Sequence, residues 1–195
     1  SELGSAIREN QHVLHYQPRV NIQNNRGVGC EALIRWQHPK LGLVPPGEFI
    51  PFAEMSDFIQ PLGLWVLETA IKQIRTWLDK GIELAVSVNL SARNLIDVTI
   101  SSYIEKYLQT YNIPAHLLEV EITESALIND PERALKTVNH VHGLGVHFAI
   151  DDFGTGYSSL SYLKRLPIDT LKIDRAFISD MLTDEQDAVI VRSTI

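Results

Sequence analysis

Two adjacent aspartates, Asp151 and Asp152, stand where a short apolar run gives way to a glycine-rich turn. The run is bounded by glycines at 145 and 154 and has the length and composition of a β-strand. Neighbouring carboxylates repel each other, and residues 143–163 contain no Lys or Arg. A divalent cation would compensate them, because Mg²⁺ is typically held by one or two carboxylates. The alternative that stays open is that Asp152 caps the next turn and Asp151 is solvated.

Other polar residues occupy equivalent places along the chain. From Val28 onward, five strand-like segments alternate with helical ones, which predicts parallel strands in βα units. Such folds place their ligands at the carboxyl ends of the strands. The polar residues at those ends are Glu31 with Arg35, Asn89, Glu121, Asp151 with Asp152, and Lys172. A purely structural explanation requires five coincidences, so the pattern indicates one site built from several strands.

Hydrophobic periodicity predicts the elements that position these residues. The expected strands are residues 28–36, 84–90, 117–123, the run ending in Asp151 and Asp152, and 170–173, and the expected helices are 1–10, 48–55, 62–79, 100–111, 131–142, 158–166 and one from 184 onward. A further strand at residues 14–20 is expected to form a hairpin with 28–36. Pro18 favours an edge or a bulge for this strand. The proline- and glycine-rich residues 38–47 are expected to be loop.

Composition bounds the class of protein. The chain has 195 residues, 45% of them hydrophobic, which is enough for one domain with a substantial core. A net charge of −7 without a basic run disfavours a nucleic-acid duplex as partner. The single cysteine, Cys30, excludes an intrachain disulfide, favours a reducing compartment and is expected to be a buried filler. No apolar run predicts a membrane span. Because the chain starts at Ser1, we expect it to be a piece of a longer protein.

Six short motifs follow one another along the chain. They are Tyr16-Gln17-Pro18, Glu31-Ala32-Leu33-Ile34-Arg35-Trp36, Val88-Asn89-Leu90-Ser91, Glu121-Ile122-Thr123-Glu124, Asp151-Asp152-Phe153-Gly154-Thr155-Gly156 and Leu171-Lys172-Ile173-Asp174. In this order they resemble the EAL-domain family of cyclic-di-GMP phosphodiesterases, which is named after the Glu-Ala-Leu triplet at residues 31–33. The resemblance covers essentially the whole chain, residues 1–195.

The resemblance implies a fold, an activity and a setting. The fold would be α/β, a TIM-like (β/α) barrel whose first strand runs antiparallel to the others. The activity would be hydrolysis of one phosphodiester bond of cyclic di-GMP, giving linear pGpG, with two Mg²⁺ or Mn²⁺ ions. The implied setting is the bacterial cytoplasm, in a homodimer that carries an upstream sensory or regulatory domain and belongs to a larger or membrane-attached protein.

The resemblance also implies metal ligands by matched position. Glu31, Asn89, Glu121 and Asp151 would hold one ion, and Asp151 would bridge to a second ion that Asp152 also binds. Carboxylate and amide oxygens suit Mg²⁺ and Mn²⁺, whereas cysteine and histidine would favour zinc. The bound cations would account for an acidic chain that takes an anionic substrate.

Further residues receive roles from the same resemblance. Lys172 would help to orient the attacking water, and Arg35, with its planar fork, would pair with a substrate phosphate. Gln17 and Leu33 would line the nucleotide site. Glu124 would anchor the loop after Asp152, which in the family links dimerisation to the metal site. The implied catalytic residues are Lys172, Asp152 and Glu31.

One departure from the family pattern affects the expected activity. The family barrel continues with two more strands, which carry Ala-Glu-Gly-Val-Glu-like and Gln-Gly-Tyr-like motifs, and neither motif occurs in this sequence. We therefore expect about six of the eight barrel strands, since complete barrels typically need about 250 residues. Weak or absent turnover would follow. The chain would be a piece of a full domain, a barrel completed by a partner copy, or a short form without catalysis.

Two rival functions stay open. The first is a receptor that binds cyclic di-GMP without hydrolysing it and passes the signal to a partner. The second is a metal-dependent enolising barrel with Lys172 as the base, although the adjacent aspartates and Arg35 fit phosphate chemistry better. A metal site at His140 and His142 is disfavoured, because residues two apart on a helix do not face each other.

Overall fold

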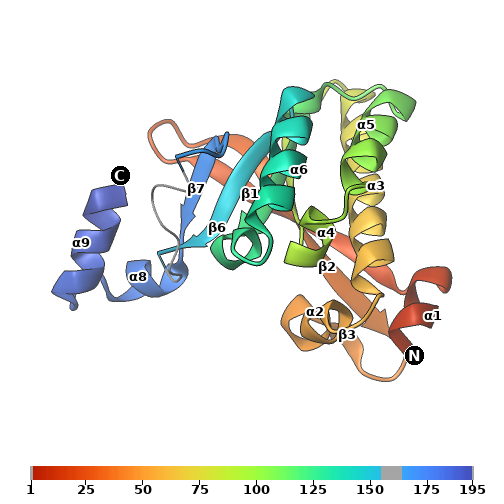
Figure 1. The fold of residues 1–195 in the computed structure, drawn as a ribbon, viewed down its shortest axis with the longest axis horizontal. Coiled ribbons are helices and arrows are strands. Elements are labelled where there is room, and N and C mark those ends of the chain that lie inside the picture. Colours follow the sequence, from red (N-terminus) through yellow and green to blue (C-terminus); the bar gives the residue numbers. More distant parts are fainter. Residues whose placement is uncertain (1, 155–163, 195) are drawn as a thin grey trace.

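A mostly parallel β-sheet forms the centre of the molecule (Figure 1). The computed structural model describes residues 2–154 and 164–194. The strand order is β1-β2-β4-β5-β6-β7, and the short β3 pairs with β2. The strands are β1 (His12–Asn21), β2 (Arg26–His38), β3 (Gly42–Val44), β4 (Ala85–Asn89), β5 (Leu118–Thr123), β6 (His147–Phe153) and β7 (Thr170–Ile173).

The direction of the strands follows the predicted pattern. β1 and β2 form an antiparallel hairpin, whereas β2, β4, β5, β6 and β7 are parallel to one another. Pro18, which cannot donate to a ladder, lies on β1 at one end of the strand order. Within the described residues β1 and β7 do not pair, so the sheet is not closed by hydrogen bonds. The fold is the predicted TIM-like α/β barrel with an antiparallel first strand, left open over these residues.

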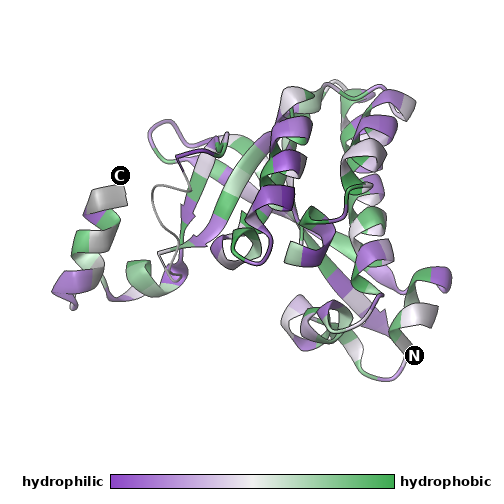
Figure 2. Cartoon of the chain, in the orientation of Figure 1, coloured by the Kyte–Doolittle hydropathy of each residue, from purple (hydrophilic) through white to green (hydrophobic). Residues whose placement is uncertain are grey.

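Most of the helices pack through an apolar face against the sheet or against one another, whereas the last two extend to one side of it (Figure 1). The helices are α1 (Glu2–Arg8), α2 (Pro46–Glu54), α3 (Ile59–Leu78), α4 (Ala92–Leu95), α5 (Ile100–Thr110), α6 (Pro131–Gly143), α8 (Arg175–Asp180) and α9 (Glu185–Thr194), with short 3-10 turns η1 (Ala115–Leu117) and η2 (Glu124–Leu127). The predicted stripe of α3 is buried at Leu62, Val66, Ala70 and Ile74. Figure 2 shows hydrophobic and hydrophilic residues alternating around the helices, which is typical of elements packed on one side only.

The core lies where the parallel strands meet the helices. In β5 every residue from Leu118 to Ile122 is buried, as expected for a parallel strand that is covered on both faces. Cys30 is also buried and free, as predicted. None of the helices in the described ranges combines the length and the hydropathy that a membrane crossing requires.

Several boundaries differ from the sequence-based expectations. The predicted loop at residues 38–47 contains β3, which pairs with the end of β2 and so extends the sheet. The short α4 and α8 were not predicted, because four to six residues give no measurable periodicity. Most of the predicted helix at 158–166 lies outside the described residues. Its last part, residues 164–166, is a bend or turn and not a helix, since the residue before Pro167 is disfavoured in the helical conformation.

Candidate metal centre

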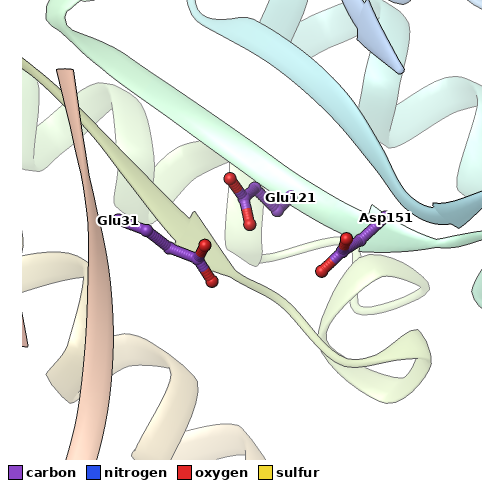
Figure 3. A group of neighbouring side chains, drawn as sticks. All are labelled: Glu31, Glu121 and Asp151. Atoms are coloured by element: carbon purple, nitrogen blue, oxygen red, sulfur yellow. The ribbon is translucent and has the colours of Figure 1, made fainter. Parts of the chain in front are cut away.

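Three carboxylates from three different strands converge at one end of the sheet (Figure 3). Glu31 comes from β2, Glu121 from β5 and Asp151 from β6. One oxygen atom of each lies within 4.8 Å of an oxygen atom of both others. Residues separated by up to 120 positions, from Glu31 to Asp151, therefore form one cluster.

The register of the strands explains how the cluster forms. The paired residues across neighbouring strands are Glu31 with Ser87, Asn89 with Glu121, and Thr123 with Asp151. Each acid-bearing strand is therefore offset from the previous one by two residues, or about 6.6 Å at the usual rise of a parallel strand. Strands that tilt around a barrel axis are staggered in this way. The tilt therefore brings Glu31, Glu121 and Asp151, which do not pair with one another in the sheet, to the same level along the barrel axis.

Lys172 on β7 joins the three acids. Its Nζ donates a hydrogen bond to Glu121 Oε2 over 2.6 Å and to Glu31 Oε2 over 3.1 Å, and it lies 3.4 Å from Asp151 Oδ2. Burial lowers the pKa of Lys172, but the hydrogen bond and charge of Glu121, with those of Glu31, outweigh burial and raise it. Lys172 is therefore a fixed cation at the centre of the cluster.

The charge and the hydrogen bonding of the cluster fit a divalent cation. Three carboxylates against one ammonium group leave two negative charges when all are ionised. The Glu121 side chain is fully buried, and burial raises the pKa of its carboxyl, an effect that Lys172 partly opposes. Its second oxygen, Oε1, is buried without a hydrogen-bond partner among the described residues. A hard cation would satisfy both the charge and this oxygen, because such ions take oxygen ligands.

Asn89 and Asp152 stand beside the cluster in different ways. The Asn89 amide donates a hydrogen bond to Glu31 Oε1 over 2.9 Å, which places the side chain against the acids. Asp152 is exposed and is not one of the three clustered carboxylates. Its backbone is left-handed (φ 55°), where the pairing of β6 with β7 is irregular, and its N–H donates to Asp151 Oδ1 over 3.0 Å. Non-glycine residues in this conformation are uncommon, and they concentrate at functional sites.

Glu124 lies next to the start of the glycine-rich turn. Its side chain is buried at the beginning of η2, and Oε2 accepts a hydrogen bond from the Gly154 N–H over 3.3 Å. The rest of the predicted turn, from Thr155 on, lies outside the described residues. The anchoring role assigned to Glu124 therefore remains a prediction that this contact supports.

A cavity of about 650 Å³ opens beside the carboxylate cluster. Its walls come from the middle of β2, the end of β4, from α2, α3 and α4, and from residues at and after the end of β5, and they include Leu33 and Asn89. The apolar side is formed by Ile50, Ile59 and other residues of α2 and α3, and the polar side includes Arg93. A pocket with apolar walls and a few polar groups is typical of a small-molecule site.

Two of the residues assigned to the substrate lie close in sequence or register to the acids. Gln17 on β1 pairs directly with Glu31 and is exposed. Arg35 lies four residues beyond Glu31 on the same face of β2, half-buried, with Nη1 donating to the Ile34 carbonyl over 2.8 Å. Neither residue lines the cavity, whereas Leu33 does.

Two charged residues near the cluster, Arg19 and Glu119, were not predicted as site residues from the sequence. Arg19 on β1 contacts the Glu119 carboxylate of β5, and its Nη1 lies 3.8 Å from Glu121 Oε1. Glu119 could have been found, because residues two apart on a strand share a face with each other and Glu121 was already a candidate. Arg19 could not have been found from the sequence, because its contact with β5 depends on how the sheet folds.

Arg93 was also missed. From α4 it donates to the backbone carbonyls of Glu54 and Ser56 and pairs with Asp57 over 2.9 Å. It thereby joins α4 to the end of α2 and to the segment between α2 and α3. Arg93 and Glu54 both line the cavity.

Comparisons with known proteins agree with this architecture. The family model of the EAL domain matches residues 1–195. The bifunctional diguanylate cyclase/cyclic di-GMP phosphodiesterase MucR of Pseudomonas aeruginosa is 43% identical over 196 residues, which cover 100% of this chain and 28% of MucR. The cyclic di-GMP phosphodiesterase PdeR of Escherichia coli is 43% identical over 195 residues, covering 100% of this chain and 29% of PdeR.

A solved structure is equally similar. The structure described as PaMucR phosphodiesterase in complex with c-di-GMP superposes with a TM-score of 0.93 at 43% identity, over 98% of this chain and 78% of that one. The chain spans less than a third of the length of the two curated relatives. The family match over the whole length, the sheet and the acidic cluster agree: the chain belongs to the EAL domain family.

Proposed function

We propose that this chain binds cyclic di-GMP and hydrolyses one of its two phosphodiester bonds to give linear pGpG. The convergence of Glu31, Glu121 and Asp151 on one point carries the proposal, because it supplies the oxygen ligands that metal-dependent phosphodiester hydrolysis needs. Relatives at 43% identity support it, since they are named cyclic di-GMP phosphodiesterases. The enolising alternative finds no support in these relatives.

In the proposed site, Mg²⁺ or Mn²⁺ is the cofactor. Glu31, Asn89, Glu121 and Asp151 would hold one ion, and Asp151 and Asp152 would hold a second. Two such ions supply Lewis-acid chemistry, neutralising the phosphodiester and making the attacking water more acidic. The three carboxylates could act together, because one oxygen of each lies within 4.8 Å of an oxygen of both others. Asp152, which lies outside this cluster, would contribute from the turn that follows β6.

The remaining residues bind and orient. Lys172, fixed by Glu31 and Glu121, points its ammonium protons into the cluster, where it would orient the attacking water. Arg35 would hold a phosphate, because its guanidinium matches two phosphate oxygens at once. Leu33 and Gln17 would contact the nucleotide. The cavity beside Asn89 has apolar walls on which a base would pack, while its ribose phosphate reaches the acids.

We further propose a larger assembly for this domain. Residues 1–195 would act as an EAL domain within a longer bacterial signalling protein that also has a sensory or regulatory domain, because the curated relatives are more than three times as long as the matched region. Homodimerisation and a cytoplasmic location are implied by the family resemblance and stay predictions. Glu124 would connect the loop after Asp152 to the dimer.

The direct test is hydrolysis of cyclic di-GMP by the full chain in Mn²⁺, followed by chromatographic separation of pGpG. We expect slow formation of pGpG, because the two further strand motifs of the family pattern do not occur in this sequence, and we expect it to stop with EDTA or with Asp151→Asn. The matched control is Glu132→Gln, an exposed acid in the first turn of α6, which should leave turnover unchanged. Tight binding of cyclic di-GMP without pGpG would instead identify the receptor, and absence of binding would refute both functions.

A further inference from the structure

A second charged group lies beside the proposed metal ligand Glu121. Arg19 reaches from β1 to β5, where its Nη1 contacts the Glu119 carboxylate. The same Nη1 lies 3.8 Å from Glu121 Oε1, which is too far for a hydrogen bond but close for a charge interaction. Glu119 and Glu121 are two residues apart on one strand and therefore face the same side. The Arg19 guanidinium therefore lies between Glu119, with which it forms an ion pair, and the proposed metal ligand Glu121.

The surrounding residues hold this arrangement in place. Gly29 is the β2 residue opposite Arg19, and a Cβ there would lie 3.0 Å from Arg19 Nη2 and 2.9 Å from the Ala85 carbonyl oxygen. The absence of a side chain at Gly29 therefore makes room for the guanidinium. On the other side, the Thr170 hydroxyl donates to Glu119 Oε2 over 3.3 Å, and Glu119 is only 6% exposed.

Two polar atoms near this pair have no partner of their own. Glu121 Oε1 and Arg19 Nε are both buried, and neither makes a hydrogen bond with a described residue. Glu121 Oε1 lies 3.8 Å from Arg19 Nη1, so an Arg19 side chain released from Glu119 would be drawn towards this oxygen. It would then compete with a cation for that oxygen. Glu119 therefore keeps the guanidinium off the ligand, while Arg19 compensates the charge that Glu119 adds.

We propose that Arg19 and Glu119 are positioning residues that set the affinity of the EAL site for its divalent cation through Glu121. This inference rests on the proposed function, because it assumes that Glu121 is a ligand. The proposal predicts that removing Arg19 and removing Glu119 change the affinity for the divalent cation in opposite directions. Glu119→Gln frees Arg19 and removes a negative charge, so the cation binds more weakly. Arg19→Gln removes the competitor and a positive charge, so the cation binds more tightly.

The test is titration of the full chain with Mn²⁺ at about pH 8, where the carboxylates are ionised. The electron paramagnetic resonance signal of the free ion measures how much Mn²⁺ is bound. Groups that hold metal ligands typically change metal affinity by about 10- to 100-fold, and we expect about tenfold for each single variant, in opposite directions. The double variant should return to within about threefold of the wild type, because the charge changes cancel. Arg19→Lys, which keeps the charge, should also stay within about threefold.

The matched control is the ion pair of half-buried Arg75 and exposed Asp79 at the end of α3, with a separation of 2.7 Å. Arg75→Gln and Asp79→Asn change the net charge by the same amounts, and we expect no shift in Mn²⁺ affinity, because solvent-accessible charges are screened. Thermal unfolding with EDTA reports folding separately. If Arg19→Gln fails to fold, Glu119→Gln and Arg19→Lys still decide the outcome.

The failures of the two proposals are distinguishable. Single variants that shift Mn²⁺ affinity in the same direction, or not at all, would overturn the role of the Arg19–Glu119 pair and leave the proposed function standing. So would an Arg19→Lys variant that binds as tightly as Arg19→Gln. A wild-type chain that binds no Mn²⁺ would overturn the metal centre and this inference together.

Discussion

Acid should destabilise this fold through His12, a buried histidine outside the metal centre. His12 lies on β1, is 4% exposed, and is surrounded by the rings of Trp36, Phe49, Phe58 and Trp65, with centroids 5.7–6.5 Å away. Neither ring nitrogen has a hydrogen-bond partner among the described residues. Burial therefore lowers the pKa of His12 from 6.5 to about 4.

The direction of the effect follows from where the proton binds more readily. The folded-state pKa lies below the unfolded value, so the unfolded chain takes up the proton first as the pH falls. The stability that depends on a neutral His12 is complete above pH 6.5 and is lost as the pH approaches 4. Two-state linkage with these pKa values gives a loss of up to about 2 kcal/mol between about pH 7.5 and about pH 5.

The assay is urea unfolding at these two pH values, monitored by tryptophan fluorescence. For wild type, the difference in unfolding free energy includes the His12 term and every other titration. His12→Phe keeps a ring in the aromatic cluster and has no proton to bind, so the difference should shrink by up to about 2 kcal/mol. At about pH 7.5 the variant should be no less stable, because it no longer buries two unpaired nitrogens.

Two further variants make the result decisive. His15→Gln, at an exposed position of the same strand, should leave the pH dependence as it is in the wild type. His12→Leu replaces His12→Phe if the larger ring does not pack. If both His12 variants lose as much unfolding free energy between the two pH values as the wild type does, the reasoning is refuted, since a different group would then be responsible.

The other predictions concern packing, charge and the cavity. Gly63→Ala places a Cβ 2.5–2.9 Å from the buried Asn94 side chain and should cost roughly 1–3 kcal/mol in urea unfolding, whereas Gly143→Ala, with nothing within 4 Å, should cost nothing. Lys172→Met leaves three acids without their cation, so the melting temperature of the variant in EDTA should fall. Adding Mn²⁺ should raise the melting temperature of the variant by more than that of the wild type. Equal increases would show that Lys172 does not balance the charge of the three acids. Ile50→Trp should fill the cavity and weaken cyclic di-GMP binding by about tenfold or more without changing Mn²⁺ affinity; unchanged nucleotide binding would show that the base lies elsewhere.

The order and type of the main elements were predictable because they depend on local rules. The period-two and period-3.6 patterns identified the β1–β2 hairpin, the five parallel strands and α3, and the capped Pro131 start identified α6. The pattern failed for α4 and α8, which are shorter than two turns. It also missed β3, because its three residues pair only through contact with the far end of β2.

The candidate site was predictable to the level of residue types and strand ends. Acids at successive strand ends indicated a cation site, and the structure brings Glu31, Glu121 and Asp151 together with Lys172. The resemblance assigned Asp152 to a second ion bridged by Asp151, and this role stays a prediction; Asp152 has a left-handed backbone and lies outside the three-acid cluster. The roles given to Arg35, Gln17 and Glu124 stay predictions.

The chain by itself determined its strands, its helices and the chemistry available at the strand ends, because short-range periodicity and side-chain type are properties of the sequence. Tertiary structure alone decided which acids meet. The two-residue stagger between β2, β5 and β6 raises Glu31, Glu121 and Asp151 to one height, and that stagger results from strand tilt, which no local pattern contains. The same tilt brings Arg19 of β1 across to β5 beside Glu121, a contact spanning about half of the chain that exists only because the sheet curves.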